Sequence, residues 1–314
     1  MVSCSNARDP QRSTPSNEGR KPASGRRRLT TRKPAYGAAP TDRRETCLHS
    51  ALVNDKGASP DSRDDPAYIP LPDAPAEALR LISDSASLTV PLRLIGGTAV
   101  WFHCPSARRP PLARAYGDID FISVSKNNRA LTTFFEVHGY EADKLFNALH
   151  GAQRLNFTDS VRGRAVDVLL DRFVMCHTIE LRERLALDAT AIPVTDLLLT
   201  KAQVIQLNEK DVKDIMALLL DHDPGNRDGI DVSRLAGATH ADWGLEHTVR
   251  QTLAEVQAAL GSAGLETGQI ATIKSNIAAV IAALDAAPKS AKWRIRARVG
   301  ERIRWYDEPE EARR

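Results

Sequence analysis

The sequence lacks any long uninterrupted hydrophobic run, so it offers no candidate for a membrane-spanning segment. Its longest apolar stretches, VDVLLD and TDLLLTKAQVI, are interrupted by charge well short of the roughly 20 residues that a helix needs to cross a bilayer. Its N-terminus, MVSCSNARDPQRS, also lacks the continuous apolar core of a secretory signal peptide. We therefore expect a cytoplasmic protein that does not contact a membrane.

Cysteine is scarce, and the best-known phosphate-binding motif is missing. The chain has 4 cysteines in 314 residues, none in C-x-x-C spacing, which argues against a zinc knuckle and a disulfide framework. We expect all four to be reduced: Cys4, Cys47, Cys104 and Cys176. No G-x-x-x-x-G-K-[ST] sequence occurs, which excludes a Walker-type phosphate loop.

Hydrophobic periodicity is nearly absent from residues 1–72, which are rich in Ser, Pro, Gly and Arg. Such a segment cannot bury enough apolar surface to offset the entropy cost of ordering, so we expect a disordered basic tail. The overall formal charge of +3 is too small to identify a nucleic-acid-binding protein. Two interpretations of the tail stay open: a solvated extension or over-called start codon, and a basic arm that holds RNA or DNA.

The remainder of the chain has the pattern of an α/β (α+β) domain over residues 75–222, followed by a helical region over residues 228–314. Period-two alternation predicts strands, and apolar residues three or four apart predict helices. Strands are expected at 87–97, 118–124, 152–159 and 164–171, the last two as a hairpin; helices are expected at 75–86, from 98, at 126–140, within 193–223 and throughout the region after 231.

Two aspartates flank an isoleucine in the stretch YGDIDFISV. On a strand, residues i and i+2 point to the same side, so Asp118 and Asp120 share one face while Ile119 and Phe121 share the other. Two carboxylates held this close repel each other unless a cation lies between them, and Mg²⁺ prefers such hard oxygen ligands. A solvated acidic pair at a strand end is the alternative interpretation.

A glycine pair ends the preceding apolar run, RLIGGTAVWFHC. Gly96 and Gly97 would end a strand and Thr98 would open a helix, leaving backbone N–H groups and the positive end of the helix dipole exposed. A phosphate can approach the backbone of glycine closely, so this turn is a candidate phosphate site. A plain strand-to-helix turn with Thr98 as the N-cap is an equally simple explanation.

A third carboxylate stands in the apolar stretch RAVDVLLD. Alternation places Val166 and Val168 on one face and Asp167 alone on the other. An acid that is half-buried in a strand must be paired or bound to a metal. We favour a metal, and a surface ion pair with Arg162 or Arg164 is the alternative.

Together these segments resemble the nucleotidyltransferase superfamily, which shares the fold of DNA polymerase β, and within it the AbiEii-type group of abortive-infection and toxin–antitoxin nucleotidyltransferases of bacteria. The matching segments are IGGTAVWFH, RAYGDIDF with Arg114 four residues before Asp118, VDVLLD, and the pair TDLLLTKAQ and EKDVKDI. The resemblance spans about residues 92–220. It departs from the usual pattern in having Gly97-Thr98 for Gly-Ser and a longer Pro/Arg loop before the aspartates, which leaves Arg108 and Arg109 without an assigned role.

The resemblance implies a mixed sheet with flanking helices and a Mg²⁺-dependent transfer of a nucleoside monophosphate from an NTP to a hydroxyl, releasing pyrophosphate. It implies that Asp118, Asp120 and Asp167 bind two Mg²⁺ ions, with Mn²⁺ as an alternative metal. It also implies that Gly96, Gly97 and Thr98 bind phosphate.

The resemblance further assigns Lys201 and Arg114 to the departing pyrophosphate, and Asp211 to orienting Lys201 or the acceptor. The plain alternatives are that Lys201 is a surface lysine and that Asp211 belongs to a solvated charged helix face with Glu209, Lys210 and Lys213. Asp214 shares a helix side with Asp211.

The partners implied are an NTP, an acceptor that is a tRNA, a protein side chain or a small molecule, and a cognate antitoxin if the chain is a toxin. The basic segment KWRIRARVGERIRWY either packs its Trp, Ile and Val side against the domain, which we favour, or contacts acceptor RNA. A catalytically inactive nucleotide- or nucleic-acid-binding module of the same fold is the competing function.

Overall fold

The computed structural model describes residues 69–88, 91–225 and 229–308. The chain divides into two compact units, residues 1–57 and 58–314, and every described residue belongs to the second. Most of the tail predicted for residues 1–72 therefore lies outside the described residues, as do Cys4 and Cys47. Cys104 and Cys176 are buried and free, in agreement with the reduced thiols predicted.

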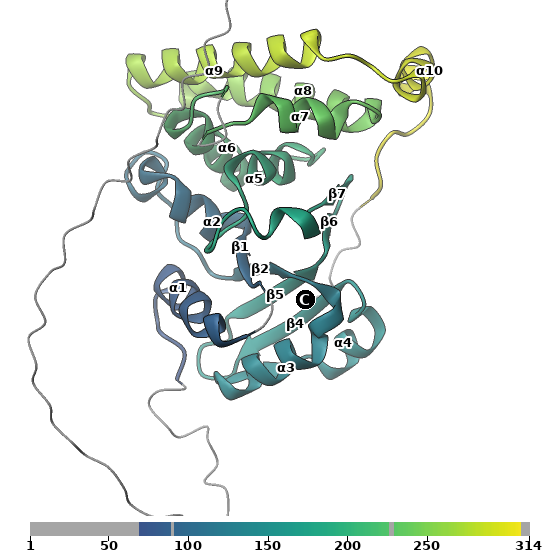
Figure 1. Cartoon of the computed structure of the whole chain (residues 1–314). Coiled ribbons are helices and arrows are strands. Elements are labelled where there is room, and N and C mark those ends of the chain that lie inside the picture. Colours follow the sequence, from purple (N-terminus) through teal and green to yellow (C-terminus); the bar gives the residue numbers. More distant parts are fainter. Residues whose placement is uncertain (1–68, 89–90, 226–228, 309–314) are drawn as a thin grey trace, which may run out of the picture. The chain divides into compact units, whose positions relative to one another are not determined.

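A five-stranded mixed sheet forms the centre of the α/β part (Figure 1), as the sequence predicted. The strand order is β1-β2-β5-β4-β3. The strands are β1 (Arg93–Ile95), β2 (Ile119–Ser123), β3 (Tyr140–Ala142), β4 (Arg154–Asp159) and β5 (Ala165–Leu170). β2 and β5 run parallel, and the other neighbours are antiparallel, so the predicted β4–β5 hairpin is confirmed.

One face of this sheet is apolar because its strands alternate. Phe121 of β2 and Phe157 of β4 are fully buried, and both rings pack against Phe135 of α3 (Asn128–Val137), with centroid separations of 5.8 and 4.6 Å. Helix α1 (Ala74–Asp84) contacts β1 and β2. Since side chains of a strand alternate between faces, residues such as Asp120 and Asp167 must point to the opposite side.

Helix α2 contacts β1 and β2 of the sheet as well as α5 and α6, and so links the sheet to the helical region, which Figure 1 shows from α5 to α10. The other elements are α2 (Gly96–His103), α4 (Lys144–His150), the separate two-stranded sheet of β6 (Arg172–Val174) and β7 (Thr178–Glu180), α5 (Val194–Ala202), α6 (Glu209–Asp221), α7 (Val232–Thr239), α8 (Trp243–Ala259), α9 (Thr267–Ala286) and α10 (Ala291–Val299). A single hydrophobic core runs through the sheet and these helices from Ala74 to Leu284. The boundary predicted between residues 222 and 228 stays a prediction.

The helical spacing predicted within residues 193–223 corresponds to two helices, α5 and α6. The break follows Ala202, and α6 restarts because the side chain of Asn208 accepts a hydrogen bond from the backbone N–H of Asp211 at 3.0 Å. Helix α4 and strand β3 were not predicted.

Among the described helices, none is by itself long and apolar enough to cross a membrane, although α9 and residues 291–302 meet the length and composition criteria when taken together across a 110° bend.

Candidate functional site

Four residues from four neighbouring strands stand opposite one another across the sheet. Asp120 of β2 pairs with Ile95 on one side and with Asp167 of β5 on the other, and Asp167 pairs in turn with Asn156 of β4. Residues paired in this way point to the same face, so Asp120, Asp167 and Asn156 gather on the face opposite Phe121. Asp118 lies one residue before the first residue of β2, so it is at the strand end and not within the strand as predicted.

The glycine pair lies directly against the acidic residues. Gly96 has φ of +70°, and a Cβ at this position would lie 2.2 Å from Asp120 Oδ2. A Cβ on Gly97 would lie 2.2 Å from Arg114 Nη2. Glycine is required most strictly at Gly96, where a side chain would meet the positive φ and the Asp120 carboxylate, whereas at Gly97 the end of the Arg114 side chain would have to shift. The backbone at the start of α2 and the Asp120 carboxylate therefore face the same small space.

Helix α2 begins at Gly96, three residues earlier than the alternative with Thr98 as N-cap requires. Ile95 occupies the N-cap position, and within the described residues no side chain caps this helix. Thr98 is buried, and its hydroxyl donates to the Ile95 carbonyl oxygen at 3.5 Å. The first turn of α2 thus keeps the positive dipole end that a phosphate group can use.

The surroundings of Asp120 destabilise its negatively charged form. Burial, followed by repulsion from Asp167 and then Asp118, raises the pKa of Asp120 from its ordinary value to about 7. Lys201 and Arg154 oppose this rise but do not overcome it. A carboxylate in this state gains from any cation that enters the space beside it.

Asp167 already has a cationic partner. Arg154 of β4 donates through Nε to Asp167 Oδ1 and Oδ2 at 2.7 and 2.8 Å, and through Nη2 to Oδ2. The Asn156 amide, in the orientation that satisfies its hydrogen bonds, donates to Asp167 Oδ1 at 2.9 Å. An ion pair with arginine was the alternative for Asp167, but Arg162 and Arg164 were the wrong residues. Arg162 pairs with Asp159, and Arg164 donates to backbone carbonyls.

The fit of a divalent metal to this donor set is partial. Mg²⁺ takes one or two carboxylates and completes its coordination with water and phosphate oxygens, and Asp118 and Asp120 have that chemistry. Among the described residues, however, no three His, Cys, Asp or Glu side chains are placed to hold one ion together. The two-metal site with Asp167 as a third ligand remains a prediction.

A second cluster joins Lys201 and Arg114 through Asp214. Arg114 donates to both carboxylate oxygens of Asp214, from Nε at 2.9 Å and from Nη2 at 2.8 Å. Lys201, in the last turn of α5, lies 2.9 Å from Asp214 Oδ2 and 3.0 Å from Asp211 Oδ1. The side chain of Asp214 is only 2% exposed. This buried carboxylate therefore holds the two predicted cations in place, a role that the sequence did not assign to it.

The plain alternatives for Lys201 and Asp211 do not match the structure. Both side chains are 15% exposed, so Lys201 is not a surface lysine. Burial lowers the pKa of Lys201, but Asp214 and Asp211 outweigh burial and raise it overall, so the ammonium stays charged. The solvated face of α6 carries the Glu209–Lys213 pair instead, at 2.7 Å.

Arg108, which had no assigned role, closes the C-terminal end of α2. It donates to the carbonyl oxygens of Trp101 and Phe102 at 2.8 and 2.7 Å, and its guanidinium lies 4.4 Å from the Trp101 ring centroid. His103 contacts the Ile192 carbonyl oxygen at 2.9 Å, and His177 contacts the Thr248 hydroxyl at 2.9 Å. These residues stabilise the fold and take no part in the acidic cluster.

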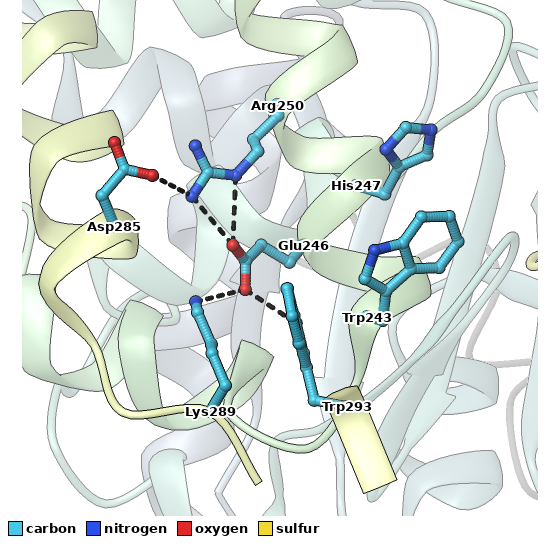
Figure 2. A pocket seen from close by; sticks show the side chains of 7 residues that line it. All are labelled: Trp243, Glu246, His247, Arg250, Asp285, Lys289 and Trp293. Atoms are coloured by element: carbon cyan, nitrogen blue, oxygen red, sulfur yellow. Dashed lines mark hydrogen bonds and ion pairs between the residues drawn. The ribbon is translucent and has the colours of Figure 1, made fainter. Parts of the chain in front are cut away.

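The basic C-terminal segment packs through its tryptophans. A pocket of about 540 Å³ lies beside Trp293, in the first turn of α10. Figure 2 shows the buried side chain of Glu246 among those that line it. Glu246 accepts hydrogen bonds from Trp293 Nε1 at 3.0 Å, from Arg250 and from Lys289. Trp305 Nε1 donates to Thr248 Oγ1 at 3.1 Å. Packing, which the sequence favoured, accounts for both tryptophans but not for the isoleucines: Ile295 and Ile303 are 65% and 63% exposed, so that part of the prediction is wrong.

Comparison with known proteins adds only weak similarities. No protein-family model and no curated protein matches the sequence. Among solved structures, lincosamide antibiotic adenylyltransferase LnuA with bound lincomycin is 16% identical with a TM-score of 0.32, covering 44% of this chain and 92% of that chain. An antigenic nucleotidyltransferase-like protein from Paracoccidioides brasiliensis is 12% identical with a TM-score of 0.34, covering 69% of this chain and 94% of that chain. At these values neither likeness carries an argument, and function has to be reasoned from the chain's own geometry.

Proposed function

We propose that this chain is a nucleotidyltransferase that moves a nucleoside monophosphate from an NTP to a hydroxyl acceptor and releases pyrophosphate, with Mg²⁺ or Mn²⁺ as its metal. One observation carries the proposal: Gly96, at an N-terminus of α2 that no described side chain caps, lies against Asp120, whose neighbour across the sheet is Asp167. A backbone that can bind phosphate thus adjoins carboxylates that can bind a metal.

Each residue of the site has a role in this proposal. The backbone of Gly96 and Gly97 and the first turn of α2 bind phosphate oxygens of the NTP. Asp118 and Asp120 would hold the metal, with Asp167 beside them. When bound, the metal neutralises phosphate charge and lowers the pKa of the attacking hydroxyl.

The Arg114–Asp214–Lys201 cluster supplies fixed positive charge. Asp214 partly neutralises Arg114 and Lys201 and fixes the orientation of both side chains. Their remaining N–H groups are then already in place to bind the leaving pyrophosphate, so no reorganisation is needed during the reaction. Asp211 adds a second contact that orients Lys201.

The resemblance to the AbiEii-type group extends the proposal to a biological role. The acceptor would be the 3′ end of a tRNA, a protein side chain or a small molecule, and the activity would be that of a toxin restrained by a cognate antitoxin. Growth arrest on expression of the wild type, absent for Asp120→Ala, tests the toxin role.

The test of the activity is direct. Purified full-length protein is incubated with Mg²⁺ and each of four α-³²P-labelled NTPs, with and without total RNA. The Asp118→Ala/Asp120→Ala double variant runs alongside, and Asp307→Ala/Glu308→Ala serves as a control that removes the same charge from the C-terminal segment. Label on RNA or protein with the wild type and the control, but not with the double variant, is expected.

One observation favours the competing function, a nucleotide-binding or nucleic-acid-binding module without catalysis. Arg154 engages both oxygens of Asp167, as a residue with a purely structural task would. Calorimetric NTP binding without any label transfer would establish the module, whereas transfer would eliminate it.

A further inference from the structure

The Arg154–Asp167 pair occupies the carboxylate that a metal site would need. Both oxygens of Asp167 accept hydrogen bonds from Arg154, and Oδ1 accepts a further one from Asn156. A carboxylate held by arginine in this two-pronged way has most of its lone pairs already engaged. The guanidinium also places a positive charge where a divalent ion would bind, so the two cations compete for the carboxylate.

The pair is built so that it can open. The Arg154 side chain is 36% exposed and Asp167 is 18% exposed, so the guanidinium lies at the rim of the site, where separation exposes it to water. Because both side chains keep some exposure to water, opening this pair does not leave an uncompensated charge in a dry interior, as opening a fully buried pair would. The guanidinium also lies 6.0 Å from the ring centroid of Phe146 on α4, at the outer limit of a cation–π contact.

We propose that Arg154 is an internal counter-ion that competes with a divalent metal for Asp167, so that metal binding displaces its guanidinium. The inference rests on the proposed function in taking Asp118 and Asp120 as the neighbouring metal ligands. It explains why Asp167 lies next to Asp120 in the sheet while no three carboxylates among the described residues converge on one point. Asp167 joins the metal site only when Arg154 leaves.

Mn²⁺ alone is the probe, and free Mn²⁺ is measured by electron paramagnetic resonance in a titration of the full chain. Arg154→Ala is expected to bind Mn²⁺ about two- to fivefold more tightly than the wild type, because the competing cation is gone. Arg154→Lys is expected to lie between them, since lysine keeps the charge but loses the two-pronged geometry.

Arg162→Ala is the matched control. Arg162 follows β4 and is 31% exposed, and its ion-pair partner is Asp159, so its removal changes the net charge equally without touching Asp167. Its Mn²⁺ affinity is expected to equal that of the wild type. Circular dichroism confirms that each variant is folded, and Arg154→Lys serves if Arg154→Ala is not.

A double-mutant cycle makes the test specific. In an Asp167→Asn background, Arg154→Ala should bring no gain in affinity, because the contested carboxylate is absent. A gain that persists there would reduce the effect to general electrostatics and overturn the inference. Equal affinities for Arg154→Ala and Arg162→Ala, or no Mn²⁺ binding by either protein, would also overturn it.

The titration contains neither NTP nor acceptor, so its failure is separate from failure of the proposed activity. If the protein transfers label but Arg154→Ala does not change its Mn²⁺ affinity, the proposed activity stands and the competition for Asp167 is rejected. Tighter Mn²⁺ binding by Arg154→Ala without any label transfer would do the reverse.

Discussion

Replacing Gly96 by alanine tests whether the glycine turn and the aspartates form one site. The new Cβ would lie 2.2 Å from Asp120 Oδ2, whereas ordinary contact begins near 3.4 Å, so the carboxylate must move by about 1.2 Å. Misplacing a reacting group by about 1 Å costs roughly 100-fold in rate. The positive φ of Gly96 adds a backbone strain of about 1–2 kcal/mol, because alanine disfavours the left-handed region.

Gly163 separates these two effects. It lies in the turn between β4 and β5 with φ of +68°, and a Cβ there would meet no atom within 4 Å. Gly163→Ala should therefore lose a similar 1–2 kcal/mol in urea unfolding while keeping its activity. Gly96→Ala should lose at least this much stability, because the clash with Asp120 adds to the strain, and about 100-fold in kcat/KM for label transfer. Equal activities for the two variants would refute the assignment of Gly96 to the site.

Three further predictions follow from the clusters described above. Glu246→Gln should lower the free energy of unfolding by about 2–4 kcal/mol, because Arg250 and Lys289 lose a buried partner. The control Glu301→Gln, at a side chain that is 61% exposed, should lower it by less than about 0.5 kcal/mol in the same urea titration. Asp214→Asn should lower kcat/KM for label transfer by about 10- to 100-fold, since Arg114 and Lys201 lose their shared anchor, and Asp211→Asn should lose less; the opposite order in steady-state assays would reject Asp214 as the anchor. In metal-free buffer, Asp120→Asn should be more stable than the wild type at pH 8, and this difference in stability should shrink as the pH falls through about 7. The reason is that the folded wild type then takes up a proton on Asp120, whereas the unfolded wild type does not. Urea midpoints of both proteins at pH 8 and pH 5 test this prediction.

The strands and helices near the site follow from local pattern. Alternation in DIDFISV and RAVDVLLD predicts β2 and β5, and the turn between residues 159 and 165 predicts the hairpin. The order of the strands in the sheet cannot be predicted in this way, because the alternation of residues shows where strands are but not which strands become neighbours. Helix α4 and strand β3 are short, and their patterns do not separate them from loop.

The site residues divide in the same way. Asp120 and the glycine pair are recognisable because their chemistry is local. The partner of Asp167 depends on the register of β4 against β5, where a one-residue shift would turn Arg154 to the other face. Asp214 became the anchor in place of Asp211 because helix burial selects between two acids three residues apart, and burial depends on tertiary packing.

The pairing of Asp120 with Asp167 on adjacent parallel strands has a consequence for how this chain can change. The distance between the two carboxylate-bearing backbones is set by the hydrogen-bonded ladder, in which neighbouring strands lie about 4.8 Å apart. The long segment that connects β2 to β5 along the chain, from α3 through β4, does not set that spacing. Residues inserted into or deleted from the loops of this segment should therefore leave the two acids at the same separation, so the surface around the site can diversify while its centre stays constant.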